Sequence, residues 1–229
     1  MAMSAKKLII LFIIALAVSL TGYGYLDLKT TRNIQDTPNT SQINNNIGQK
    51  NIDEQAGRLY KIKVEQSQII WSGEKIIGSG HIGNVKILNG QILLDNGNNL
   101  KSANFSIDMN SITESRNNQQ VVTHLKSADF FDTAAYPLSE LKITAMERSK
   151  NDFFNVSGDL TIKGITQKII FPAQINIKDD EIQAKAEFNI DRTNWNIEYG
   201  SGKFFKELAD QAIKDEINFK VDLSTSIQE

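Results

Sequence analysis

From Tyr60 onward, apolar and polar side chains alternate every two residues in one segment after another. Side chains on a β-strand point to opposite faces in turn, so this alternation predicts strands with one buried face and one face in water. Glycine, asparagine and aspartate separate the segments, as they do at the turns between antiparallel strands. The alternating segments are residues 60–64, 69–83, 85–88, 91–94, 105–109, 141–145, 154–162, 166–177, 182–190 and 217–223.

The number of strands and the abundance of turns together predict the fold class. About eight strands with two helical insertions indicate an all-β fold, and an antiparallel barrel in preference to a parallel sheet. A barrel also removes the free strand edges that a secreted, strand-rich protein must protect. The four glycines within residues 69–83 suggest bulges or a tightly bent barrel wall.

Four pairs of turn-forming residues mark where one strand ends and the next begins. Asn89-Gly90 is the strongest of them, because this pair favours a two-residue type I′ hairpin. Asn96-Gly97, Lys163-Gly164 and Asp179-Asp180 predict three further turns. Before the last strand, residues 203–213 place their apolar side chains on one helical face and are predicted to form a helix.

Residues 124–137 interrupt the strand pattern and concentrate rings in a short segment. Val121, Val122 and Leu125 recur at helical spacing, so residues 119–127 are predicted to form a short helix. A helix that lays aromatic rings against a sheet can act as a lid or plug at one end of a barrel. The alternative is that these rings only fill the core, as buried phenylalanine commonly does. The ring-bearing residues of the segment are His124, Phe130, Phe131 and Tyr136.

Residues 1–26 are predicted to be a signal peptide or a retained membrane anchor. Lys6-Lys7 precede an uninterrupted apolar run over residues 8–20, apart from one serine, and that length is typical of a signal-peptide core. Tyr23 and Tyr25 extend the run towards the length of a thin membrane span and suit a membrane interface. Both interpretations stay open.

The composition changes after the N-terminal run and sets the domain boundaries. Residues 27–57 are rich in asparagine and have no apolar period, so a disordered polar linker is expected there. Residues 58–229 form the strand-rich domain. The lysines near the N-terminus stay on the cytoplasmic side, so the domain is expected to be extracytoplasmic, periplasmic or secreted. An uncleaved N-terminal segment would hold it at the membrane.

The charge and the missing residue types exclude several functions. The formal net charge is −2 and no basic cluster lies in the domain, so nucleic acid is not an expected partner. The chain has no cysteine, which removes disulfides, thiolate metal sites and cysteine nucleophiles. Its two histidines, His81 and His124, form no paired metal-ligand spacing and lie near no Gly-x-Ser-x-Gly elbow. We therefore predict no enzyme, catalytic residue, metal or cofactor, with a hydrolase using His81 or His124 as the alternative.

A cation and an indole lie close together at residues 191–195. Arg192 and Trp195 either close a strand end as a surface pair or contact a ligand. The sequence alone leaves both interpretations open.

Four stretches together resemble one family. They are residues 71–75 with 80–83 (WSGEK and GHIG), residues 124–137, residues 158–166 (GDLTIKGIT), and residues 190–193 with 199–202 (IDRT and YGSG). Through them, residues 60–224 resemble the YceI-like family of polyisoprenoid-binding, lipocalin-like secreted proteins. Residues 64–68 (VEQSQ) depart from the Asp-x-x-His-Ser arrangement frequent there, so the resemblance implies no head-group contact from the first strand.

The resemblance implies an eight-stranded antiparallel, lipocalin-like barrel with a long apolar pocket and a helical segment beside it. It also implies an extracytoplasmic binding or carrier protein for an isoprenoid-type lipid, a polyprenyl chain or a quinone, held with its tail inward. An alternative of another class is a non-catalytic structural or stress-related surface domain, whose barrel would be solid inside. The candidate ligand-binding residues are Phe130, Phe131 and Tyr136 on the aromatic segment, and Trp71, His81 and Trp195 near strand positions.

Overall fold

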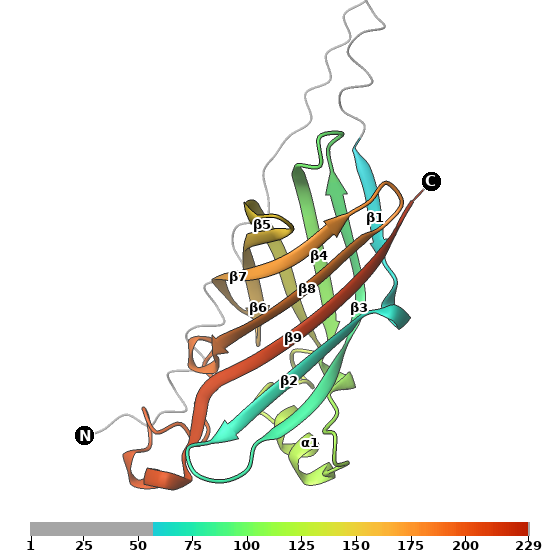
Figure 1. The fold of residues 1–229 in the computed structure, drawn as a ribbon. Coiled ribbons are helices and arrows are strands. Elements are labelled where there is room, and N and C mark those ends of the chain that lie inside the picture. Colours follow the sequence, from blue (N-terminus) through green and yellow to red (C-terminus); the bar gives the residue numbers. More distant parts are fainter. Residues whose placement is uncertain (1–56, 229) are drawn as a thin grey trace, which may run out of the picture. The chain divides into compact units, whose positions relative to one another are not determined.

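The computed structural model describes residues 57–228, and Figure 1 shows these residues as a curved sheet that closes on itself. The predicted N-terminal segment, residues 1–26, lies outside the described residues, as does nearly all of the predicted linker. None of the helices within residues 57–228 is long and apolar enough to cross a membrane. The strands are β1 (Arg58–Ile62), β2 (Gln68–Lys75), β3 (His81–Leu94), β4 (Leu100–Asp108), β5 (Leu138–Lys150), β6 (Phe153–Ile162), β7 (Ile165–Ile177), β8 (Ile182–Asp191) and β9 (Ile213–Ile227). The helical segments are α1 (Gln119–Lys126) and the 3-10 turns η2 (Val64–Gln66), η3 (Met109–Ser111), η4 (Arg192–Trp195) and η5 (Lys206–Gln211).

The barrel closes because every strand from β2 to β9 pairs antiparallel with the next and β9 pairs back with β2. β1 and β2 share one position in the wall. β1 pairs with the last residues of β3 and of β9, and β2 pairs with the earlier part of each strand. The break between them is the single turn η2. The predicted eight-stranded antiparallel barrel is therefore confirmed, with its first position split in two.

The prediction of a hairpin at Asn89-Gly90 is wrong, because β3 continues through this pair as one strand. The register against β4 shifts between Ile87 and Asn89, so the pair forms an irregularity within the wall. A Cβ atom on Gly90 would lie only 2.6 Å from the ring of Phe105 and 2.7 Å from Ile62. This glycine is required for close packing inside the barrel, and the same residue type produced the misleading turn signal.

The other three predicted turns are confirmed. Asn96-Gly97 lies between β3 and β4, where Asp95 Oδ1 accepts hydrogen bonds of 2.8 Å from the backbone N–H groups of Gly97 and Asn99. Lys163-Gly164 connects β6 to β7 with positive φ at both residues. Asp179-Asp180 lies between β7 and β8.

The helix expected before the aromatic segment forms, and the one expected before the last strand does not. Asn118 Oδ1 caps α1 by accepting hydrogen bonds from the backbone N–H groups of Gln120 and Val121. Within residues 203–213 only the short turn η5 is present, and Ala209 interrupts it with φ 43° and ψ −120°. The carbonyl groups of Asp210 and Ala212, which follow this kink, accept hydrogen bonds from the connection between β2 and β3, and this tertiary pairing overrides the helical pattern.

The larger non-strand segments lie at one end of the barrel. In Figure 1, α1, the connection between β2 and β3, and the segment before β9 lie at this same end. We call it the helical end. Antiparallel pairing places it at the carboxyl ends of β2, β4, β6 and β8 and the amino ends of the strands that follow them.

Candidate functional site

A cavity of about 740 Å³ occupies the barrel interior. Its wall includes residues from every strand between β2 and β9 and from α1, and most of the lining side chains are apolar. The volume lies in the usual range for small-molecule sites, which are concave and mainly apolar with a few convergent polar groups. The barrel is therefore hollow, and the solid interior expected of a purely structural domain is absent from the part of the chain described here.

The cavity is polar at one end only. At the end away from α1 its lining is aliphatic and includes Leu94, Leu100, Ile175 and Ile182. Ten polar or charged residues line it at the helical end, and the only other charged lining residue is Lys185, part-way along β8. The ten are Glu74, Lys75, Ser79, His81, His124, Ser139, Arg192, Tyr199, Gln211 and Lys214.

The cavity opens to solvent at the helical end. Lys75, Ser79 and Gln211 line the cavity, and their side chains are also exposed at the surface. They come from the last residue of β2, from the connection between β2 and β3, and from η5. The last two segments are joined by hydrogen bonds of 2.8 Å from Ile76 N to the Ala212 carbonyl and 3.3 Å from Ile77 N to the Asp210 carbonyl. A ligand that enters here meets polar groups first and aliphatic wall beyond them.

A cluster of rings forms one wall near this opening. His124 on α1 lies edge-on to Phe130, with ring centroids 5.3 Å apart, and edge-on to Tyr199 at 4.3 Å. Phe131 lies 6.0 Å from Phe130. The chain turns back after α1 because the backbone N–H groups of Phe130 and Asp132 both donate to the Ser127 carbonyl. That turn brings both phenylalanines against the cavity.

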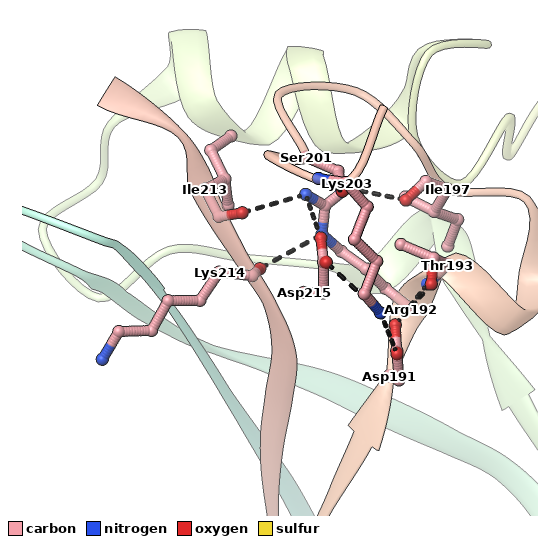
Figure 2. A network of polar contacts seen from close by, with 9 residues as sticks. All are labelled: Asp191, Arg192, Thr193, Ile197, Ser201, Lys203, Ile213, Lys214 and Asp215. Carbon is pink, nitrogen blue, oxygen red and sulfur yellow. Dashed lines mark hydrogen bonds and ion pairs between the residues drawn. The ribbon is translucent and has the colours of Figure 1, made fainter. Parts of the chain in front are cut away.

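Arg192 holds the segment after β8 to the start of β9, as Figure 2 shows. Its side chain is only 1% exposed. The guanidinium donates to the Ile197 carbonyl at 2.7 Å, and to the Lys214 and Ile213 carbonyls at 3.2 and 3.3 Å. It also bonds Asp215 Oδ1 at 3.3 Å and lies 5.6 Å from the centre of the Phe130 ring.

The charges around Arg192 offset part of the cost of its burial. Burial lowers the pKa of Arg192 below its ordinary value, and the carboxylates of Asp215 and Asp191 act in the opposite direction without cancelling it. Burial alone would raise the pKa of Asp191, but hydrogen bonds from Lys203 and Thr193 outweigh it and leave the pKa below its ordinary value. The Asp191 carboxylate in turn raises the pKa of Lys203, which lies 2.6 Å away.

His81 lies beside a buried carboxylate at the cavity wall. Its Nδ1 is 3.2 Å from Glu114 Oε1, and Arg116 Nε donates to the same oxygen at 3.1 Å. Burial would raise the pKa of Glu114. Hydrogen bonds from the backbone N–H of Asn118, from the His81 side chain and from Arg116 outweigh this and lower the pKa to about 2. Within residues 57–228, neither histidine ring bonds a serine or threonine hydroxyl, and no cluster of acidic and histidine side chains could hold a metal ion.

Four of the six predicted ligand-binding residues line the cavity: Phe130, Phe131, Trp71 and His81. Tyr136 does not, because its ring lies over Gly164 at the turn between β6 and β7. Trp195 also lies outside the lining; it is fully buried, and its Nε1 donates to the Leu160 carbonyl at 3.1 Å. Their roles towards a ligand stay predictions, and we carry forward only the four that face the cavity.

The interpretation of Arg192 and Trp195 as an exposed pair is wrong, since both side chains are buried. The arginine faces Phe130 and main-chain carbonyls. Sequence reasoning did not single out Tyr199, and it considered Arg192 only as one side of an open alternative, a ligand contact made together with Trp195. Both belong to stretches that carry the family resemblance, residues 199–202 and 190–193. That position in the resembling stretches is the sequence signal that could have identified them as site residues.

Comparison with known proteins agrees with this geometry. The family model described as YceI-like domain matches residues 60–225. A UPF0312 protein of Pseudomonas putida is 30% identical over 76 residues, which are 33% of this chain and 40% of that protein. Protein YceI of Escherichia coli is 29% identical over 76 residues, 33% of this chain and 39% of the relative. The match thus spans about two fifths of the length of these curated relatives.

Two solved structures share the barrel. BcnA of Burkholderia cenocepacia superposes with a TM-score of 0.59 at 22% identity, covering 71% of this chain and 98% of BcnA. A polyisoprenoid-binding domain from Saccharophagus degradans, implicated in plant cell wall breakdown, superposes with a TM-score of 0.56 at 13% identity, covering 74% and 98%. At these identities the likeness shows the fold.

Proposed function

This chain belongs to the family of YceI-like domains, and from that premise we propose that its barrel binds an isoprenoid-type lipid, a polyprenyl chain or a prenylated quinone. The single observation that carries the proposal is the large, mainly aliphatic cavity that opens at one end of the barrel. The description of the Saccharophagus degradans domain as polyisoprenoid-binding supports the ligand class.

Apolar burial alone is large enough to hold such a ligand. Each carbon buried contributes about 0.8 kcal/mol, so a five-carbon isoprene unit contributes about 4 kcal/mol. Association costs on the order of 4–15 kcal/mol, so about four buried units offset even the upper value. The protein then needs few directed polar contacts, which agrees with the aliphatic lining of the closed end.

The lipid lies with its tail inward and its head group at the helical end. The distribution of polar side chains supports this orientation, since ten of the eleven polar or charged lining residues lie at that end. His81, His124 and Tyr199 offer hydrogen-bonding groups beside the opening, and Phe130 and Phe131 offer apolar surface just inside it. Of the cations that line this end, Arg192 and Lys214 are paired with Asp215 and Glu74, whereas Lys75 makes no ion pair within residues 57–228 and stays available to a head group.

The role is binding or carriage rather than catalysis. The partners of His81 are a carboxylate and a guanidinium, which supply neither a nucleophile nor a bound metal. We place the protein outside the cytoplasm, at the membrane or in the periplasm, on the strength of the apolar N-terminal run behind Lys6-Lys7.

A pair of matched substitutions on β8 tests the proposal. Ala186 faces the cavity and Glu187 faces outward on the same strand. Ala186→Phe puts a ring where the tail would lie, so we expect loss of prenyl-quinone binding by a fold-intact protein. Glu187→Phe adds the same ring to the outer face and should bind as the parent does. If the parent binds no prenyl lipid, or if Ala186→Phe binds as well as the parent, the proposal is wrong.

A further inference from the structure

Four large apolar side chains are exposed on two neighbouring segments at the opening of the cavity. Ile76 and Ile77, in the connection between β2 and β3, are 52% and 62% exposed. Phe204 and Phe205, just before η5, are 48% and 40% exposed. We call these four residues the mouth rim. The two segments form one surface because the backbone N–H groups of both isoleucines donate to carbonyls at the end of η5.

The mouth rim differs in position from the exposed apolar residues midway along the barrel wall. Leu88 on β3 and Ile170 on β7 are also exposed, but each stands on a strand of the wall, away from the cavity opening. Single exposed apolar residues are normal on protein surfaces, whereas a group of them marks an interaction site. Phe205 belongs both to the mouth rim and to the cavity lining, since its side chain is exposed to solvent and also lines the cavity.

We propose that the mouth rim docks on the surface of a lipid bilayer, so that a lipid passes between the bilayer and the cavity without crossing water. The inference rests on the proposed function, because a prenyl chain that enters the cavity must pass these side chains. The rim is continuous with the apolar lining through Phe205 and Leu208. Isoleucine and phenylalanine side chains that insert at the boundary between head groups and acyl chains are removed from water, which stabilises the docked state.

A bilayer fits this surface better than a second copy of the chain does. A second copy on the rim would cover the opening and block the path of the ligand. The charges of the two segments are nearly balanced, with four lysines and three acidic residues in residues 74–80 and 199–214. Lys214 is bound to Glu74 at 2.8 Å, and Lys203 to Asp191 at 2.6 Å. Docking is therefore driven by apolar insertion and does not require anionic lipid.

The absence of cysteine from the chain permits a site-specific test on the full-length protein. Ile77→Cys and Phe204→Cys each carry one NBD fluorophore, and Ile170→Cys carries the same label on the outer wall of β7 as the control. On mixing with phosphatidylcholine vesicles, we expect a blue shift and intensity rise at the two rim sites, quenched by doxyl-labelled phosphatidylcholine. The label at the control site should not respond. This comparison holds even when the N-terminal segment binds the vesicle, because all three variants carry it.

Removing the rim isoleucines should shift the response to higher lipid concentration. Burying two half-exposed isoleucines in the bilayer increases the partition coefficient of the protein from water to the vesicle on the order of 30-fold. The Phe204→Cys label should therefore need about 30-fold more lipid for its half-maximal response when Ile76→Ser and Ile77→Ser are added. The matched pair Leu88→Ser and Ile170→Ser should leave the response unchanged. An equal response at all sites, or no response at the rim, overturns the proposal. A rim response that grows with protein concentration without vesicles also overturns it, and identifies a second copy as the partner.

Farnesol, a soluble short prenyl alcohol, separates the two proposals. The rim double variant should bind farnesol as the parent does, because the cavity lining is unchanged. If the parent binds farnesol or a prenyl quinone but the rim labels stay in water, the docking proposal fails alone. If the rim labels enter the bilayer but the parent binds no prenyl compound, the proposed function fails.

Discussion

Replacing Arg192 by methionine should destabilise the barrel strongly. The guanidinium makes four hydrogen bonds, to the carbonyls of Ile197, Ile213 and Lys214 and to the carboxylate of Asp215. These bonds tie the segment after β8 to the first residues of β9. Methionine keeps much of the apolar stem and removes every donor.

The expected loss is about 3–5 kcal/mol in the free energy of unfolding, the usual result when one partner of a buried ion pair is removed. The carbonyl of Ile197 loses a bond of 2.7 Å in a buried position, and such an unsatisfied group alone costs about 1–3 kcal/mol. Asp215 is less affected, since Lys203 lies 3.5 Å from its other oxygen. In a domain of this size, such a loss lowers the midpoint of thermal unfolding by about 10 °C.

Urea unfolding followed by circular dichroism measures this loss directly. Arg148→Met is the matched control, because Arg148 is exposed and bonds one carbonyl, that of Asn151, at 2.6 Å. We expect the control to lose about 1 kcal/mol or less. If Arg192→Met costs no more than Arg148→Met, the network around Arg192 does not stabilise the fold as argued.

Three further outcomes are expected. Phe131→Ala should weaken prenyl-lipid binding in a fluorescence titration while Tyr136→Ala leaves it unchanged, because only Phe131 lines the cavity; equal effects would contradict the assignment. Gly83→Ala should lower the midpoint of urea unfolding and Gly73→Ala should not, since an added Cβ overlaps a backbone carbonyl oxygen at Gly83 and meets nothing within 4 Å at Gly73. The pKa of Glu114 is lowered from 4.5 to about 2 in the folded protein, so its contribution to stability is present above the unfolded-state pKa and is lost as pH falls from about 5 to 2. Glu114→Gln should flatten the pH dependence of urea unfolding in that window, and an unchanged pH profile would show that the carboxylate does not contribute.

The barrel could be predicted because strand alternation is a local property. Most residues with a two-residue period lie in strands with one inward face, and closure was expected from the number of strands and the turns between them. The errors arose where packing between distant residues decides the local structure. Gly90 is small because Phe105 and Ile62 pack over it, and neither residue is its neighbour in the sequence.

The site was only partly predictable for a similar reason. Phe130 and Phe131 stand out because they are rings in a short non-strand segment beside a helix. The position of Arg192 at the cavity could not be derived from the sequence, because three of its partners are backbone carbonyls, two of them more than twenty positions away on β9, and a carbonyl group gives no sequence signal. The polarity of one cavity end is likewise a result of topology, since it collects residues from six separate segments.

Native mass spectrometry of the full-length protein, purified under mild conditions from cells that make it, tests the central claim most directly. The account predicts one bound lipid per chain, with a mass equal to a polyprenyl or prenyl-quinone compound, and loss of this adduct in Ala186→Phe but not in Glu187→Phe. A parent protein that carries no lipid, and that gains none when mixed with prenyl quinone or polyprenyl phosphate, would contradict it.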